Sequence, residues 1–123
     1  MNGLLVFVGG GIGALSRYLV GLAAAKLWGA GFPFGTLAAN MIGVFLIGLF
    51  FGLAERHSFL TGPARIFFVT GFLGGLTTFS SFGWETVKLA GDGLLALALA
   101  NFLLNNLVGL GLVIAGMWLG KSI

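Results

Sequence analysis

The chain has 123 residues, of which 59% are hydrophobic and only 7% are charged, and its formal net charge is +3. So much apolar surface exceeds what a soluble domain of this length can bury, which excludes an ordinary soluble protein. The basic residues stand singly, so nucleic acid is not expected as a partner, and the absence of cysteine excludes disulfides and thiolate chemistry.

Four apolar segments are each about as long as the roughly 20 residues that a membrane-spanning helix needs. They cover residues 4–27, 36–53, 64–90 and 94–119. The first is expected to be a retained helix rather than a signal peptide, because apolar sequence continues past Arg17. Short connections imply antiparallel neighbours, so the chain is predicted to be an all-α membrane protein, with residues 1–123 as one domain, in the cell (inner) membrane.

Each predicted helix carries two glycines four residues apart. Such small-xxx-small pairs let helix backbones approach closely in a membrane, where no hydrophobic force draws helices together. They favour tight packing or oligomerisation, although a chain with 23 glycines also produces such pairs by chance. The pairs are Gly9 and Gly13, Gly48 and Gly52, Gly71 and Gly75, and Gly116 and Gly120.

Basic residues are divided almost equally between the two sides of the predicted bundle. Arg56, Arg65 and Lys121 share one side, whereas Lys26 and Lys88 lie on the other, which Arg17 also joins if it snorkels. Because lysine and arginine imbalance sets orientation, a near tie predicts dual topology and permits an antiparallel homodimer. The alternative is that one extra basic residue fixes a single orientation.

The third segment contains the run 74–82, which is polar where a membrane helix should be most regular. Two adjacent glycines each weaken a helix by about 1 kcal/mol relative to alanine. The hydroxyls of the threonines and serines that follow compete for backbone partners. A break in the third helix is therefore predicted, and irregular backbone inside a bilayer indicates an ion or substrate site.

Asparagines are among the few polar side chains inside the other spans. Asn40 lies in the second segment, and Asn101 and Asn105 share one face of the fourth, whereas Asn106 is expected to point elsewhere. Asparagine between membrane helices also serves simply to join them. That interpretation remains open for each of the three.

The predicted spans hold hydrogen-bond donors but no carboxylate at membrane depth, because Glu55, Glu85 and Asp92 all fall near helix ends. A cation site usually needs a buried carboxylate, whereas an anion needs donors and the positive edges of aromatic rings. Phe79 and Phe82, three residues apart after the predicted break, fit an anion pathway. Lipid-facing or core packing is the alternative for these two rings.

The run Gly74-Gly75-Leu76-Thr77-Thr78-Phe79-Ser80-Ser81-Phe82 resembles the signature of the Fluc/CrcB family of fluoride channels. The resemblance extends over the whole chain. Its other parts are the glycine-rich opening from Gly9 to Tyr18, Gly35-Thr36-Leu37 with Asn40 and Gly43, and the stretch from Asn101 to Gly109.

This resemblance implies a dual-topology homodimer with two antiparallel pores that passively conducts fluoride out of the cytoplasm. Arg17 would lie near an aqueous vestibule, and backbone carbonyls of Gly74 and Thr77 would hold a structural sodium ion (Na+) at the dimer interface. The family often has threonine where this chain has Ser81, and some relatives have serine where it has Gly109. The implied fluoride pathway comprises Asn40, Phe79, Ser81, Phe82, Asn101 and Asn105.

Other classes fit the sequence less well. Small multidrug-resistance exporters depend on a glutamate in the first helix, where this chain has only Arg17 and Lys26. A structural or assembly subunit would leave the break and the phenylalanine pair unexplained. A dinucleotide-binding reading of Gly9-x-Gly11-x-x-Ala14 lacks the acidic residue that this motif requires. No set of nucleophile, base and orienting group indicates an enzyme.

Overall fold

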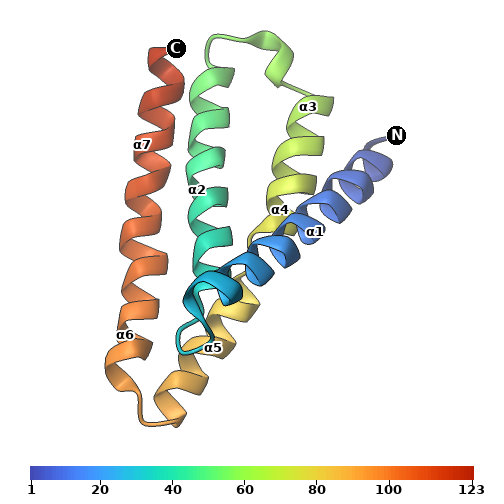
Figure 1. Ribbon diagram of the computed structural model, residues 1–123. Coiled ribbons are helices and arrows are strands. Elements are labelled where there is room, and N and C mark those ends of the chain that lie inside the picture. The colour runs from blue at the N-terminus through green and yellow to red at the C-terminus, as the bar shows by residue number, and fades with distance from the viewer.

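The computed structural model describes residues 1–123 and contains helices and no strands (Figure 1). Four helical spans are long and apolar enough to cross a membrane. They are α1 (Asn2–Trp28), α2 (Phe34–Ala54), Pro63–Gly91 and Leu95–Ser122. Consecutive spans run in opposite directions, and both termini lie toward the end of the bundle where α2 connects to α3 (Figure 1). The four spans predicted from hydropathy are confirmed.

The last two spans are not uniform α-helices. The third consists of α3 (Pro63–Arg65), the π-helix η2 (Ile66–Leu73), α4 (Gly74–Leu76) and α5 (Phe79–Gly91). The fourth consists of α6 (Leu95–Leu103), the π-helix η3 (Leu104–Val108) and α7 (Gly109–Ser122). A short 3₁₀ turn, η1 (Ser58–Leu60), lies in the α2–α3 connection. The π turns shift the helix faces that the sequence pattern assumes.

Thr77 and Thr78 separate α4 from α5, within the run 74–82. Both have extended backbone, with φ −84° and ψ 154° at Thr77 and φ −149° and ψ 117° at Thr78. The Thr78 hydroxyl accepts a hydrogen bond from the Ser81 N–H, so Thr78 is the N-cap of α5. The helix therefore ends just after Gly74 and Gly75, which have low helix propensity, and a new helix begins after the N-cap Thr78.

Glycines bring pairs of helices into backbone contact. α2 packs along α7, and α1 packs along η2 and α4. A Cβ atom on Gly48 would overlap the Val113 carbonyl oxygen, and one on Gly116 would overlap the Phe45 carbonyl oxygen. The tight packing predicted for all eight paired glycines is confirmed, since each faces the backbone of another helix. The other six are Gly9, Gly13, Gly52, Gly71, Gly75 and Gly120.

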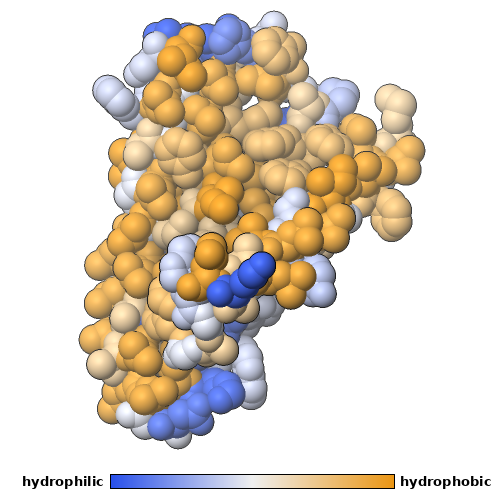
Figure 2. Space-filling model, viewed as in Figure 1, coloured by the Kyte–Doolittle hydropathy of each residue, from blue (hydrophilic) through white to orange (hydrophobic).

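The single chain has a small core and an apolar exterior. Only 18 of 123 residues are buried, so most of the large hydrophobic side chains lie on the surface. Figure 2 shows an apolar band between hydrophilic patches over the α2–α3 connection and over the α5–α6 connection. An exterior of this kind requires a cover of lipid or of other protein.

Replacing Gly116 with valine should force α7 away from α2, because the added Cβ meets the Phe45 carbonyl. We expect overpacking of this kind to destabilise the fold by about 1–3 kcal/mol or more. Gel filtration and thermal unfolding in detergent measure the effect. Gly111→Val in the same helix is the matched control, because no atom lies within 4 Å of its Cβ position. Equal stability of the two variants would contradict this packing.

Candidate functional site

The side chain of Asn40 in α2 pairs with the interrupted backbone of the third span. The Thr78 N–H donates to Asn40 Oδ1 at 2.8 Å, and Asn40 Nδ2 donates to the Thr78 carbonyl oxygen at 3.2 Å. One amide thus satisfies both polar groups of an extended residue, as a neighbouring β-strand would. Without it, both groups would remain unpaired where water is scarce, at a considerable cost in free energy.

Further amides and a hydroxyl continue from Asn40 toward the fourth span. Asn40 Nδ2 donates to Asn105 Oδ1 at 2.9 Å, and Asn105 Nδ2 donates to Asn101 Oδ1 at 3.1 Å. Asn101 is fully buried, and its Nδ2 donates to the Thr86 hydroxyl oxygen at 2.9 Å. Asn101 and Asn105 do lie on one face of the fourth span, as their spacing predicts.

A cleft of about 200 Å³ opens beside these residues. The two predicted phenylalanines meet edge to face there, with ring centroids 5.5 Å apart; Phe82 is buried, whereas Phe79 is 80% exposed. The lining contains no charged side chain. It consists of Asn40, Val44, Thr77, Thr78, Phe79, Phe82, Asn105 and Asn106.

Four of the six predicted pathway residues line this cleft, and the other two contact its walls. Ser81 bonds to the hydroxyl of Thr78 at 3.2 Å, and Asn101 lies behind Asn105. The expectation that Asn106 points elsewhere is wrong. Asn106 also lines the cleft, because the π turn η3 changes the angle between successive side chains.

Arg17 of α1 contacts the backbone just before the interruption. Its Nε donates to the Gly75 carbonyl oxygen at 3.0 Å. In a continuous helix that carbonyl would accept from Phe79 N–H, so the arginine replaces a lost helical hydrogen bond. Lysine could supply the charge but not the planar set of donors that fixes this geometry.

The interruption also leaves backbone groups of both polarities without helical partners. The Gly74 carbonyl loses its partner because the Thr78 N–H bonds to Asn40, and the Thr77 carbonyl loses its partner because the Ser81 N–H bonds to Thr78. On the other side, the N–H groups of Phe79 and Ser80 at the start of α5 have no backbone acceptor. Carbonyl oxygens therefore precede the interruption, and amide donors follow it.

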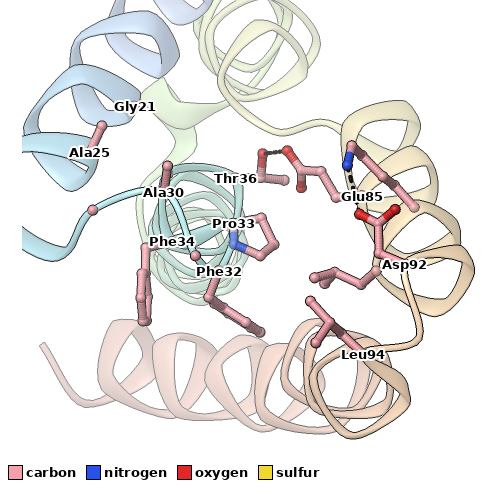
Figure 3. A pocket seen from close by; sticks show the side chains of 15 residues that line it. Gly21, Ala25, Ala30, Phe32, Pro33, Phe34, Thr36, Glu85, Asp92 and Leu94 are labelled. Carbon is pink, nitrogen blue, oxygen red and sulfur yellow. Dashed lines mark hydrogen bonds and ion pairs between the residues drawn. The ribbon is translucent and has the colours of Figure 1, made fainter.

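A larger hollow of about 600 Å³ lies between the α1–α2 connection and α5 (Figure 3). Thr36 Oγ1 donates to Glu85 Oε1 at 2.7 Å, and Lys88 pairs with Asp92 at 2.7 Å. The expectation that Glu85 falls near a helix end is wrong, since it lies in the middle of α5 (Phe79–Gly91). The Thr36 bond and the hollow accommodate its carboxylate, whose Oε2 is buried without a partner.

A cleft of amides, hydroxyls and aromatic rings at an interrupted helix, within four spans, defines a small multi-pass membrane protein with an uncharged polar site. The family model described as "CrcB-like protein, Camphor Resistance (CrcB)" matches residues 4–117, so the chain belongs to the CrcB family. Proteins named "Fluoride-specific ion channel FluC" from three organisms are similar to it. The Agrobacterium fabrum protein is 45% identical (100% of this chain, 98% of the relative), the Roseiflexus sp. protein 44% (100%, 96%) and the Clostridium perfringens protein 39% (96%, 92%).

Replacing Asn40 with alanine should destabilise the fold by about 1–3 kcal/mol, because it leaves the part-buried Thr78 N–H and carbonyl without partners. Equilibrium unfolding in mixed detergent micelles measures this change. Asn106→Ala is the matched control, since its side chain bonds only to the Phe102 carbonyl of the same span and should change stability little. If the two variants proved equally stable, Asn40 would not support the interruption.

Proposed function

We propose that the chain is a fluoride-selective ion channel that passively exports fluoride from the cytoplasm. Full-length similarity to proteins named as fluoride-specific channels supports this function. The observation that carries it in this chain is a cleft between the helical spans that is lined by amides, hydroxyls and aromatic rings and by no charged residue. Such a cleft can solvate a small anion without a fixed charge that would trap it.

The fluoride pathway follows the start of α5. The N–H groups of Phe79 and Ser80 have no backbone acceptor, and the N-terminus of a helix carries a partial positive charge. The positive ring edges of Phe79 and Phe82 add weak attraction that holds fluoride without a full charge. Ser81, Asn40, Asn101 and Asn105 supply the remaining hydroxyl and amide groups.

Arg17 attracts the anion toward this region. Only its Nε is occupied by the Gly75 carbonyl, so the terminal guanidinium nitrogens keep donors and a positive charge available at the edge of the interruption. A vestibule that carries one such charge raises the local concentration of an anion without binding it tightly. The residue thus serves both the backbone and the ion.

The channel is a dual-topology homodimer with two antiparallel pores. The near tie between basic residues on the two sides supports insertion in both orientations. The exposed apolar exterior supplies surface for a second copy as well as for lipid. Phe79, 80% exposed in one chain, would be covered by that copy.

A structural sodium ion fits the carbonyls of Gly74 and Thr77. Both have lost their helical partners, and hard cations prefer oxygen ligands. Gly74 is exposed, so its carbonyl is accessible to a second copy that would contribute the same two groups. The ion would neutralise the carbonyl ends of the two interrupted helices where they meet.

Liposomes that contain only the purified protein should lose fluoride rapidly and retain chloride. Parallel vesicles loaded with each ion and read with ion-selective electrodes measure both fluxes. Protein-free vesicles are the control for leak. If folded protein in the same vesicles conducted neither ion, a structural or assembly subunit would be the better interpretation.

Asn40→Asp should stop fluoride flux, because it places a negative charge in the cleft and repels the anion. Phe79→Ile and Phe82→Ile should reduce flux, because they keep apolar volume and remove the ring edge. The same efflux assay measures all three variants, with Phe59→Ile as a control on an exposed ring outside the cleft. Flux equal to the wild type in all three would contradict the assigned pathway.

A further inference from the structure

A chain of hydrogen bonds runs through three spans and returns to α5. Each group in it donates to the next, over donor–acceptor distances of 2.7 to 3.1 Å. In order, the groups are the Thr78 backbone N–H, the side chains of Asn40, Asn105, Asn101 and Thr86, and the Phe82 backbone carbonyl. We call this set of groups the amide chain.

The amide chain can run in only one direction, because its two ends have fixed chemistry. The Thr78 N–H can only donate, so Asn40 must turn its oxygen toward it. The Phe82 carbonyl can only accept, so Thr86 must donate to it at 2.7 Å. The three asparagine amides between these ends have one orientation that pairs every donor with an acceptor.

Thr86 holds the end of the amide chain that lies away from the cleft. Its hydroxyl donates its single proton to the Phe82 carbonyl, so only its lone pairs face Asn101. Asn101 is fully buried, and the Thr86 oxygen is the one acceptor that its Nδ2 contacts. The orientation of the Asn101 side chain therefore depends on this hydroxyl, whereas Asn105 Nδ2 also donates to the Asn101 backbone carbonyl at 2.9 Å.

We propose that Thr86 is a positioning residue for fluoride conduction, which acts through the amide chain although it does not line the cleft. The conductance test of this inference rests on the proposed function, whereas the hydrogen bonds of the amide chain are independent of it. Thr86 sets the direction of Asn101, the Asn101 oxygen accepts from Asn105, and Asn105 occupies one donor of Asn40. An anion that binds Asn40 must displace this acceptor.

Valine at position 86 has nearly the shape of threonine but no acceptor. The Asn101 amide is then free to turn over, which places its nitrogen against the nitrogen of Asn105. Asn105 cannot turn over to relieve this contact, because its Nδ2 donates to the Asn101 backbone carbonyl and its oxygen accepts from Asn40. The conflict is relieved when the whole Asn105 side chain moves toward the cleft, where the lone pairs of its oxygen repel fluoride.

Single-channel recording in planar bilayers tests this inference. Loss of one oriented hydrogen bond corresponds to about a tenfold effect, so Thr86→Val should lower the unitary fluoride conductance about tenfold. A variant that merely folded poorly would give fewer channels of unchanged conductance. The unitary conductance therefore separates a positioning role from a structural one.

Two variants complete the design. Thr86→Ser keeps the hydroxyl and should restore wild-type conductance. Ser122→Ala removes a hydroxyl with the same bond to the carbonyl four residues earlier, here Trp118, but outside the amide chain, and should also conduct normally. Wild-type conductance in Thr86→Val, or failure of Thr86→Ser to restore it, would overturn the proposal.

The amide chain can also be tested without any flux. In protein labelled with ¹⁵N asparagine, the side-chain amide protons of Asn101 should exchange with solvent more slowly than those of the exposed Asn2. Equally fast exchange in the wild type would overturn the proposal, even if no Thr86→Val protein could be purified. A wild type that shows slow exchange but no fluoride current would instead contradict the proposed function.

Discussion

The structure depends on how one extended residue is satisfied inside a membrane. Backbone N–H and carbonyl groups there have little water to bond, which is why spans are normally continuous helices. Thr78 departs from that rule, and the side chain of Asn40 pairs with both of its polar groups. An asparagine amide has the same donor and acceptor as a peptide group. A single side chain can therefore pair with Thr78 as a neighbouring β-strand would.

This interruption creates two environments of opposite polarity within a few residues. The carbonyls of Gly74 and Thr77 lack helical partners and attract cations, whereas the N–H groups of Phe79 and Ser80 attract anions. Under the proposed function, one local departure from helical geometry serves both the structural sodium ion and the permeating fluoride. Arg17 donates to the carbonyl of Gly75, which lies between Gly74 and Thr77 in the chain. This hydrogen bond keeps the Gly75 carbonyl from competing with those of Gly74 and Thr77 for the cation.

The sequence predicts those features that depend on residues close together in the chain. Apolar length defines the four spans, the spacing of Asn101 and Asn105 defines their common face, and glycine spacing defines the close helix contacts. Features that depend on local unwinding or tertiary pairing were missed. Asn106 reaches the cleft from the π turn η3, and the Glu85 carboxylate in the middle of α5 accepts a hydrogen bond from Thr36 of another span. Thr86 gains importance from a partner fifteen residues away, which no spacing rule identifies.

The proposals for the dimer, the sodium ion and the pore are not independent of one another. Within one chain, Phe79 is 80% exposed and Gly74 lies on the outside, so neither the ring edge nor the carbonyl is enclosed. An ion held by weak donors needs exclusion of water for those donors to be effective. A second copy over this face would enclose both groups, whereas lipid would supply neither the matching carbonyls nor a polar wall. A chain that proved to be a monomer in the bilayer would therefore weaken the sodium site and the pore assignment together.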